Sequence, residues 1–279
     1  MMNILIAERF HPTGRALLEG IPEVNITEAK EFSKPSKEEL VACDILVIRS
    51  KTKIHHQLLE QAPELKLIVS TTSGFDHIDF EALKKHTACA SYTPEANAIA
   101  AAELTITLAL ASLKRSISAN QMARSGTWNR HLVTGSEING KTWGIVGLGR
   151  VGKRVANIAR AFGAQIKASD PYLEEEEFTQ LGITRLSTDE VFKESDIVSL
   201  HVPLTPETQN MISPHQLSDL GPNGLLINTS RGEVLNEQHL VQALDSKKLG
   251  AAALDVFQNE PIDTNSQLCR LNSLTLSPH

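Results

Sequence analysis

A glycine-rich hexapeptide near the middle of the chain constrains the fold more than any other feature. It reads Gly147-Leu148-Gly149-Arg150-Val151-Gly152 and follows an apolar run, residues 143–146, that is typical of a buried strand. A helical pattern continues from it over residues 151–162. A G-x-G-x-x-G motif alone is weak, but between a strand and a helix it indicates a turn that presents a helix N-terminus to phosphate groups.

Each glycine of this motif has a physical reason. Gly147 permits the tight turn, Gly149 lets the backbone approach a pyrophosphate, and Gly152 lets the helix pack on the strand. Asp170 ends the next predicted strand, 18 residues after Gly152, where a carboxylate accepts hydrogen bonds from a ribose. The two residues after Asp170 are not cationic, which favours NAD over NADP as the cofactor. The alternative is a turn that binds nothing and a surface Asp.

Short apolar runs alternate with helical patterns from end to end, as in parallel sheets covered by helices. Strands are predicted at residues 4–7, 24–27, 45–48, 67–70, 88–91, 143–146, 165–169, 197–200, 225–228, 251–256 and 274–276. Helices are predicted at residues 38–42, 55–61, 80–86, 151–162, 189–194 and 237–246. Asn97 is a plausible N-cap for a long Ala-rich helix that ends near Leu113. We therefore predict two α/β domains, residues 1–96 and 97–279, each Rossmann-like and doubly wound, with helices on both faces of a parallel sheet and a cleft between the domains.

Composition excludes several classes of protein. The net charge of -6 argues against nucleic acid or an anionic membrane as a partner. The 3 cysteines lie far apart with no C-x-x-C spacing, which indicates reduced thiols and a cytoplasmic protein. The apolar run at residues 98–113 is interrupted by Glu103 and is shorter than the roughly 20 residues that span a bilayer. We expect no metal site, and we read the acidic run at residues 174–177 as a solvated surface.

Several further segments resemble one family when they are taken together and in order. They are Ile48-Arg49-Ser50-Lys51-Thr52, Ser73-Gly74-Phe75-Asp76-His77-Ile78-Asp79, the glycine hexapeptide, Asp170-Pro171-Tyr172, His201-Val202-Pro203-Leu204-Thr205, Asn228-Thr229-Ser230-Arg231-Gly232, residues 255–261 and Ser277-Pro278-His279. The chain is similar over nearly its whole length to the D-isomer-specific 2-hydroxyacid dehydrogenases, and most similar to those that oxidise D-3-phosphoglycerate. The resemblance implies an NAD-dependent enzyme that interconverts a small anionic 2-hydroxy acid and its 2-oxo acid.

The resemblance also implies a catalytic set made of Arg231, Glu260 and His279. Arg231 would hold the substrate carboxylate and polarise the carbonyl oxygen with its planar set of donors. His279 would be the general acid and base. Glu260 would bond the far nitrogen of His279 and raise its pKa by favouring the imidazolium. Taken singly, Arg231 as a helix cap, Glu260 as a loop residue and His279 as a disordered terminal residue are reasonable alternatives.

Other roles carry over by position. The first domain would bind substrate and the second NAD. The cofactor residues would be Gly147, Gly149, Arg150, Val151, Gly152, Asp170, Val202, Thr229, Ser230 and Asp255. The substrate residues would be Arg49, Ser50, Ser73, Gly74 and Asn97, with the loop of Ser73 and Gly74 receiving the carboxylate through its N–H groups. Lys51, Lys53 and Arg130 are further candidate cations for a phosphate, although the two lysines could equally be solvated surface charges.

The chain departs from the family pattern in three places. His77 stands where many relatives have Asn, and Ser70 stands where the compared phosphoglycerate dehydrogenases have an Arg. The family also continues past the residue that corresponds to His279 with a segment that returns to the first domain. We expect a chain that ends at His279 to be a poor catalyst for that reason.

Alternatives to the phosphoglycerate assignment stay open at this stage. One is a reductase of the glyoxylate, hydroxypyruvate or D-lactate type. Another is an NAD-binding regulatory protein on the same fold, similar to the family's corepressors, which share the catalytic trio. A third is a formate dehydrogenase, which needs no acid–base His. In each case we expect a homodimer built on the second domain, with the helix at residues 98–113 in the interface.

Overall fold

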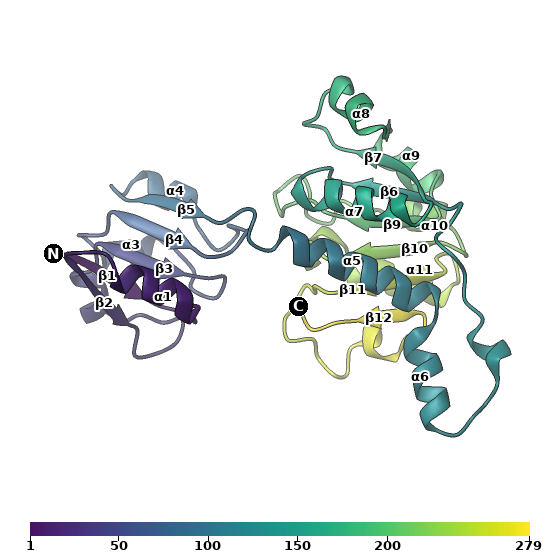
Figure 1. Ribbon diagram of the computed structural model, residues 1–279, viewed down its shortest axis with the longest axis horizontal. Coiled ribbons are helices and arrows are strands. Elements are labelled where there is room, and N and C mark those ends of the chain that lie inside the picture. The colour runs from purple at the N-terminus through teal and green to yellow at the C-terminus, as the bar shows by residue number, and fades with distance from the viewer. The chain divides into compact units, whose positions relative to one another are not determined.

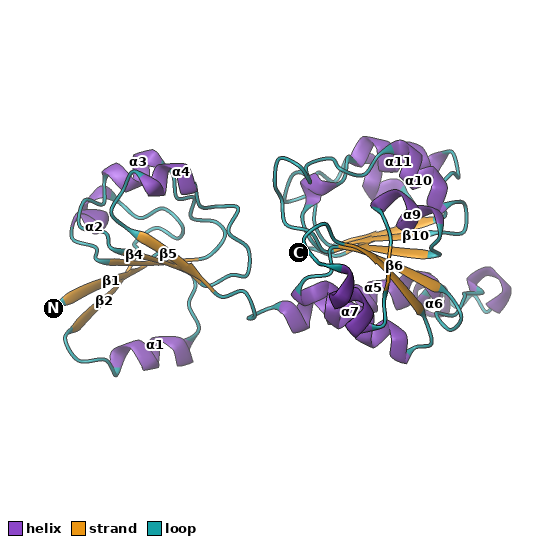
Figure 2. Cartoon of the chain, turned by 90° about the horizontal axis from the view of Figure 1, so that it is seen from above, coloured by secondary structure: helices purple, strands orange, loops and turns teal.

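The computed structural model describes residues 1–279 and divides into two compact units, Met1–Asn97 and Ala98–His279. Each unit contains one parallel sheet with helices on both of its faces (Figure 2). The predicted α/β class with two doubly wound sheets is therefore confirmed. No helix has both the length and the apolar character that crossing a membrane requires.

Unit 1 contains a sheet of 5 strands in the order β2-β1-β3-β4-β5 (Figure 1). The strands are β1 (Met2–Ile6), β2 (Val24–Glu28), β3 (Ile45–Ile48), β4 (Leu67–Ser70) and β5 (Cys89–Tyr92). The helices are α1 (Pro12–Glu19), α2 (Lys37–Val41), α3 (His56–Glu60) and α4 (Phe80–Lys84). Helix α1 lies on one face of the sheet and the other three lie on the opposite face (Figure 2). The strand order reverses between β1 and β3, and ligands of open α/β sheets bind at the carboxyl ends of strands at such a point.

Unit 2 contains a sheet of 7 strands in the order β12-β11-β10-β9-β6-β7-β8. The strands are β6 (Thr142–Val146), β7 (Gln165–Ser169), β8 (Thr184–Arg185), β9 (Ile197–Leu200), β10 (Leu225–Asn228), β11 (Ala251–Leu254) and β12 (Leu274–Leu276). The order around β6 is that of a dinucleotide-binding fold extended by one strand, and it reverses between β6 and β9. The sheet therefore places its switch point beside the glycine turn that follows β6.

Helices cover both faces of this sheet (Figure 2). One face carries α5 (Ala98–Leu113) and α7 (Arg150–Ala161), and the other carries α9 (Thr188–Lys193), α10 (Pro214–Leu220) and α11 (Glu237–Asp245). The remaining helical segments are α6 (Ser116–Arg124), α8 (Glu175–Leu181), η1 (Arg130–Val133), η2 (Gly232–Val234) and η3 (Gln267–Arg270). Trp143, Phe178 and Phe192 are fully buried. Burial of side chains of this size stabilises the unit by about 1.5–3 kcal/mol each.

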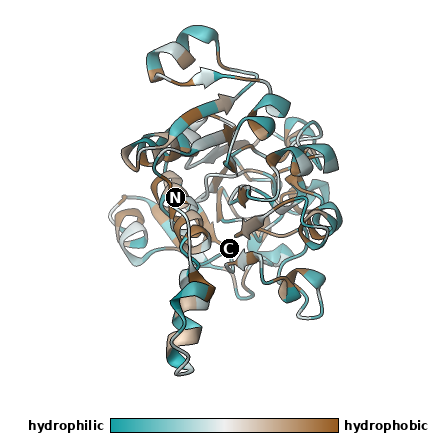
Figure 3. Cartoon of the chain, turned by 90° about the vertical axis from the view of Figure 1, so that its right-hand side faces the viewer, coloured by the Kyte–Doolittle hydropathy of each residue, from teal (hydrophilic) through white to brown (hydrophobic).

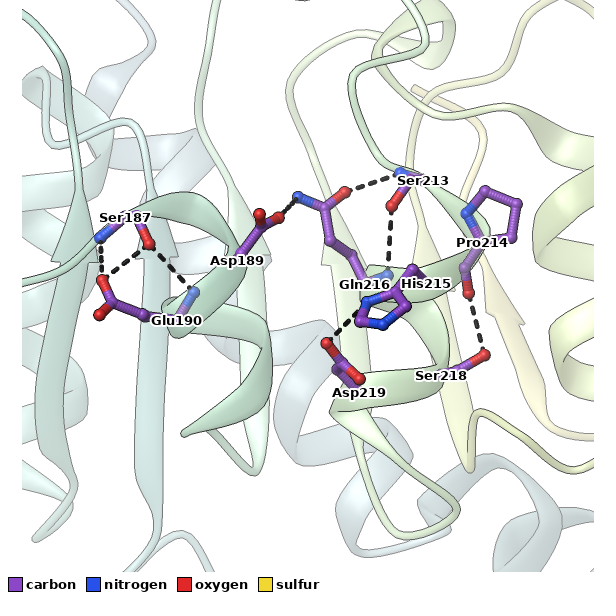
Figure 4. Close-up of polar contacts among 9 residues, drawn as sticks. All are labelled: Ser187, Asp189, Glu190, Ser213, Pro214, His215, Gln216, Ser218 and Asp219. Atoms are coloured by element: carbon purple, nitrogen blue, oxygen red, sulfur yellow. Dashed lines mark hydrogen bonds and ion pairs between the residues drawn. The ribbon is translucent and has the colours of Figure 1, made fainter.

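Local capping determines where α9 and α10 begin (Figure 4). Ser187 caps α9 through the N–H of Glu190, whose carboxylate accepts from the Ser187 N–H at 2.8 Å. Ser213 and Gln216 form the equivalent box at α10. The Gln216 side chain also donates to Asp189 at 2.8 Å, which ties the two helix starts together. These boxes satisfy backbone groups that a helix leaves unpaired.

The predicted strands all occur, although the run predicted to end at residue 256 ends at Leu254. The helices α1, α6, α8 and α10 and the short strand β8 were not predicted. Helix α1 has no buried residue, and of its side chains only partly buried Leu18 packs against the hydrophobic core. The start of α10 was marked by Ser213, Pro214 and Gln216, a capping box with Pro at the first helical position.

Candidate functional site

The glycine turn lies at the switch point of the unit 2 sheet. Gly147 has a φ of 92°, a conformation that side chains with a Cβ rarely adopt. A Cβ on Gly147 would lie 2.7 Å from the carbonyl oxygen of His201, at the end of β9. A Cβ on Gly152 would lie 2.2 Å from the Gly147 carbonyl oxygen. The fold itself therefore requires glycine at both positions.

Gly149 differs from its two neighbours in the motif. A Cβ on Gly149 would meet no protein atom within 4 Å, and its φ of -75° suits any residue. Gly149 is the N-cap of α7 and provides no side-chain cap, so the first N–H groups of α7 keep their hydrogen-bonding capacity. Open space at a helix N-terminus is what a pyrophosphate needs, so glycine at this position serves a ligand and not the fold.

Asp170 lies beside the glycine turn and helps to shape it. Its carboxylate accepts from the N–H of Leu148 at 2.8 Å and from that of Tyr172 at 2.9 Å, which leaves one lone pair on each oxygen. Asp170 lines a pocket of about 640 Å³ in unit 2. Predicted cofactor residues Gly147, Gly149 and Val202 line the same pocket.

A cation that the residues next to Asp170 in the sequence do not reveal lies in the same pocket. Arg185, from the short strand β8, also lines the pocket that contains Asp170. Its guanidinium lies 5.4 Å from the centre of the Phe178 ring and 3.7 Å from the Glu175 carboxylate. The absence of a cation directly after Asp170 in the sequence was therefore an incomplete reason, because β8 pairs with β7 and brings an arginine to the same pocket.

His201 is a pocket residue that the sequence did not single out. Its Nε2 lies 2.9 Å from the Ser199 hydroxyl, which also accepts from the Trp143 indole N–H at 2.9 Å. The Ser199 hydrogen has no other acceptor, so it is donated to Nε2 and the proton of His201 lies on Nδ1. Burial lowers the pKa of His201 to about 3, so this imidazole is neutral at physiological pH.

Arg231 lies in a turn that follows β10. Buried Asn228 shapes this turn: its side-chain oxygen accepts from the Ser230 N–H at 3.0 Å and hydroxyl at 2.8 Å, and its amide donates to the Arg231 carbonyl at 2.9 Å. The guanidinium of Arg231 is partly buried and donates to the Ser230 carbonyl at 2.7 Å. The Thr229 hydroxyl lies 2.8 Å from that of Thr105 in α5.

The turn of Arg231 packs tightly against the turn that follows β11. A Cβ on Gly232 would lie 2.0 Å from the carbonyl carbon of Phe257, so only glycine permits this approach. The second turn carries Glu260, whose carboxylate accepts from the Phe257 N–H at 3.1 Å. The turns after β10 and β11 thus place Arg231 and Glu260 at the same edge of the sheet, because β10 and β11 are parallel neighbours.

His279 joins this edge through the turn that follows β12. Its Nδ1 lies 2.7 Å from the second oxygen of Glu260. Because a carboxylate only accepts, Nδ1 donates its hydrogen, and Nε2 makes no hydrogen bond within the protein. The side chain of His279 is 53% exposed. The arrangement can present a nitrogen that gives or takes a proton, held in one orientation by a carboxylate.

The residues expected to contact substrate in unit 1 follow the carboxyl ends of its strands. Buried Glu8, which follows β1, accepts from the N–H groups of Arg49 and Thr52 at 2.9 and 2.8 Å. This clamp lies at the switch point of the unit 1 sheet and holds the loop of Arg49 and Ser50, both of which are exposed. Lys51 lies over the Phe32 ring at 5.7 Å.

The other predicted unit 1 residues come from separate segments. Ser73 and Gly74 lie in the turn after β4, and Asn97 is the last residue of unit 1. Four residues of the two units, Glu8, Ser199, Asn228 and Ser277, were given no role from the sequence. Each lies in the last two residues of a predicted strand or directly after that strand, and this position was their signal in the sequence.

The fold and this constellation define a dinucleotide-binding α/β protein. Residues 106–279 match the model of the D-isomer specific 2-hydroxyacid dehydrogenase family, NAD binding domain. The chain therefore belongs to the D-isomer specific 2-hydroxyacid dehydrogenase family, and NAD is the cofactor of the matched domain. Open space at Gly149, the position of this glycine at the N-terminus of α7 and the two free lone pairs of Asp170 fit that cofactor.

The relatives of this chain within the family are dehydrogenases and reductases with different names. The chain is 36% identical over 284 residues to a D-3-phosphoglycerate dehydrogenase of Methanocaldococcus jannaschii, with 100% of this chain and 53% of that protein covered. It is 36% identical to a glyoxylate reductase of Thermofilum pendens, with 95% and 81% covered. A D-lactate dehydrogenase of Aquifex aeolicus, solved with NAD and lactic acid, is similar at a TM-score of 0.88 and 28% identity, with 99% and 88% covered. The chain spans about half the length of the phosphoglycerate dehydrogenases that it matches.

Proposed function

We propose that this chain catalyses the NAD-dependent interconversion of a D-2-hydroxy acid and its 2-oxo acid. The observation that carries the proposal is the contact of His279 Nδ1 with Glu260 at 2.7 Å, which leaves Nε2 without a partner at the edge that carries Arg231. The nicotinamide of bound NAD accepts or supplies the hydride. The chain's own residues bind the carboxylate, orient the carbonyl and move the proton.

His279 is the proposed acid and base. In reduction, Nε2 gives its proton to the substrate oxygen, and in oxidation it removes that proton from the hydroxyl. Glu260 holds the ring and compensates the positive charge while both nitrogens are protonated. Arg231 binds the carboxylate and stabilises the developing alkoxide. We propose Arg49, Ser50, Ser73, Gly74 and Asn97 as further substrate contacts.

A test measures NADH oxidation with glyoxylate, hydroxypyruvate and pyruvate, and NAD reduction with 3-phosphoglycerate. Arg231→Ala and His279→Ala should each lower kcat by about 10²–10⁴-fold while the dissociation constant for NAD changes little. His215→Ala is a matched control, because His215 is 82% exposed and is paired with Asp219 in α10. Retention of full activity by His279→Ala would refute the acid–base assignment, and a chain with no turnover of any 2-oxo acid would favour the regulatory alternative.

We propose 3-phosphoglycerate as the first candidate substrate. The support is the set of phosphoglycerate dehydrogenases among the relatives, at 33 to 36% identity over nearly the whole chain. Exposed Arg49 makes no hydrogen bond or ion pair with its guanidinium, and Lys53 is exposed nearby in sequence. Lys51 is a weaker candidate because it stacks on Phe32. The glyoxylate reductase relative supports an uncharged side chain instead.

Comparison of variants distinguishes these substrates. Arg49→Ala should raise KM for 3-phosphoglycerate at least about tenfold and leave KM for glyoxylate within a factor of three, because a charge-assisted hydrogen bond contributes about 1.5–3 kcal/mol. Lys84→Ala is the control, because Lys84 forms an ion pair with Glu81 in α4. A higher catalytic efficiency for glyoxylate, unaffected by Arg49→Ala, would reject the phosphate.

We also propose a cytoplasmic homodimer. The segment from α6 to η1, which we call the arm, contains no buried residue. Its apolar residues Ile117, Trp128 and Leu132 are 47%, 91% and 59% exposed. In Figure 1 it extends away from the rest of unit 2, and Figure 3 shows hydrophobic residues along its helix. A helix of 9 residues is marginal without packing, so we infer that a second copy covers this arm. Most apolar residues of α5 pack inside unit 2, which leaves the arm as the stronger part of the proposed interface.

Light scattering at micromolar concentration tests the dimer. Trp128→Asp should halve the measured mass, because stable homodimer interfaces commonly bury about 2,000 Å² or more and tolerate no unpaired central charge. Leu17→Asp is the control, since Leu17 is 72% exposed on α1 of unit 1. A wild-type monomer would reject the dimer.

A further inference from the structure

Three consecutive backbone N–H groups in unit 1 donate to no atom of the protein. They belong to Ser73, Gly74 and Phe75, in the turn between β4 and α4. All three residues are partly exposed. Consecutive unpaired N–H groups in a turn are the components of an anion-binding concavity, and such groups take a ligand or water as their partner.

Beneath this turn, three side chains form a hydrogen-bonded chain that ends on its backbone. The His77 Nε2 lies 2.9 Å from the Ser70 hydroxyl, which lies 2.8 Å from the Thr72 hydroxyl. Thr72 in turn donates to the Gly74 carbonyl at 2.9 Å. Ser70 is 0% exposed and His77 is 5% exposed, so water does not compete for these bonds. We call His77, Ser70 and Thr72 the hydroxyl chain.

Counting hydrogens fixes the direction of every bond in the hydroxyl chain. A carbonyl only accepts, so the single hydrogen of Thr72 is committed to Gly74. Ser70 must then donate its own hydrogen to Thr72, and it accepts from His77. His77 therefore carries a proton on Nε2. Hydrogen bonds that all run in one direction polarise one another, and this strengthens the hydrogen bond from Thr72 to the Gly74 carbonyl.

The direction of that carbonyl determines the direction of the next N–H group. In a trans peptide the C=O and N–H point in opposite directions, so a Gly74 carbonyl drawn toward Thr72 turns the Phe75 N–H away from the hydroxyl chain. The Phe75 ring is held independently, with its centre 5.7 Å from that of Phe80 and 5.5 Å from that of Tyr92. The N–H group and the side chain of Phe75 are therefore both held in position in the absence of a ligand.

We propose that the hydroxyl chain presets this turn for the substrate carboxylate and that the Phe75 N–H is a third donor beside Ser73 and Gly74. His77, Ser70 and Thr72 are positioning residues in this role, because they act through the Gly74 peptide and not on the substrate. Without them, Gly74 has the conformational freedom to rotate its peptide, and that freedom must be lost on binding. This inference rests on the proposed function, because it assumes that the anion is the carboxylate of a 2-oxo or 2-hydroxy acid.

The kinetic test removes one hydroxyl at a time in the full chain with NADH and glyoxylate. Thr72→Val keeps the shape of the side chain and should raise KM for glyoxylate about fivefold with kcat nearly unchanged, because a hydrogen bond that serves binding alone acts on ground and transition states equally. The matched control is Thr71→Val in the same turn. The Thr71 hydroxyl donates to the Ile48 carbonyl at 3.1 Å and lies outside the hydroxyl chain, so its loss should leave KM within a factor of two of the wild-type value.

The role of His77 is tested with two variants, one that keeps a hydrogen-bond donor and one that removes it. His77→Gln places an amide donor near the position of Nε2 and should keep KM within about twofold of wild type, whereas His77→Leu should match Thr72→Val. The dissociation constant for NAD should stay constant in all variants. Equal KM changes in Thr72→Val and Thr71→Val, or a His77→Leu variant with wild-type KM and a wild-type melting temperature, would overturn the proposal.

A second readout does not depend on turnover. Amide resonances of Ser73, Gly74 and Phe75 are followed by NMR as oxamate, a stable carboxylate, is added to the NAD-bound chain. All three should shift in the wild type, and Thr72→Val should need about five times more oxamate for half the change. Shifts without enzymatic turnover would keep this site while rejecting the proposed function. Turnover with no shift at Phe75 would reject the third donor alone and leave the proposed function in place.

Discussion

The hydroxyl of Ser277 donates to the carboxylate of Asp255 at 2.5 Å, and this bond joins the segment that carries His279 to the end of β11. The Ser277 N–H also donates to the Leu254 carbonyl at 3.0 Å. Two bonds therefore fix the backbone two residues before His279. Ser277 therefore links Asp255, proposed as a cofactor residue, to the backbone that leads to His279, proposed as the acid and base.

This relationship predicts a specific effect of Ser277→Ala. Loss of a hydrogen bond to a carboxylate loosens His279 and should lower kcat for 2-oxo acid reduction about tenfold, because hydrogen bonds to charged groups contribute about 1.5–3 kcal/mol. Ser277→Thr keeps the hydroxyl and should restore most of the rate. Steady-state kinetics with saturating NADH provide the measurement, and unchanged kcat in Ser277→Ala would show that the bond does not position His279.

Gly149 and Gly152 allow a matched test of the cofactor turn. Gly149→Ala meets no protein atom, so the free energy of unfolding should change by less than about 1 kcal/mol, while NAD affinity should fall at least tenfold as the methyl enters the pyrophosphate space. Gly152→Ala meets the Gly147 carbonyl and should destabilise unit 2 by about 1–3 kcal/mol. Urea unfolding and calorimetric NAD titration separate the two effects. Equal stability losses would contradict the assignment of Gly149 to the ligand.

Asp170 and Arg185 together predict how cofactor preference can be altered. The wild type should bind NAD more tightly than NADP, because the Asp170 carboxylate repels a 2′-phosphate. Asp170→Ser removes that repulsion beside a cation already in the pocket, so NADP affinity should rise at least about tenfold. Asp170→Ser combined with Arg185→Ala should lose this gain. Fluorescence titrations at fixed salt measure the dissociation constants for both cofactors. Equal dissociation constants for NAD and NADP in the wild type would refute the role of Asp170.

Burial explains why the sequence predicted the strands well. Residues of β9 and β10 are all buried, so both strands appear as mostly apolar runs in which Ser199 and Asn228 are the single polar residues. Helix α1 was harder to predict because it buries little. All residues of α1 are at least partly exposed. Gly14 of this helix packs against Phe10, a contact that hydrophobic periodicity in the sequence does not predict.

Site residues could be predicted from the sequence where their positions follow from short-range spacing. Residues that strand pairing within the sheet brings together were harder to predict. Gly147, Gly149, Gly152 and Asp170 follow a fixed spacing that one strand and one helix impose. Arg185 enters their pocket only because β8 pairs with β7, and such a pairing cannot be read from a run of 2 residues. The contact of Glu260 with His279 was expected from resemblance, but its support by Phe257, Gly232 and Ser277 depends on how parallel turns pack.

His201 predicts a pH dependence of folding stability. Its pKa falls from 6.5 to about 3 in the folded protein because burial disfavours the charged ring. Between these two values the unfolded chain binds a proton that the folded chain does not, so the stability contributed by neutral His201 is present above pH 6.5 and is lost as the pH falls toward 3. At pH 5 the loss amounts to about 1–2 kcal/mol.

The measurement is urea unfolding at pH 7.5 and pH 5.0. His201→Gln replaces the ring by a neutral amide that can still accept from Ser199, so it should lose about 1–2 kcal/mol less than the wild type between the two conditions. His215→Gln is the control, because His215 is 82% exposed and should leave the wild-type dependence nearly intact. A His201→Gln variant whose stability falls as steeply as that of the wild type would show that His201 is protonated in the folded protein, and the neutral hydrogen-bonded chain from Trp143 through Ser199 to His201 would then be wrong.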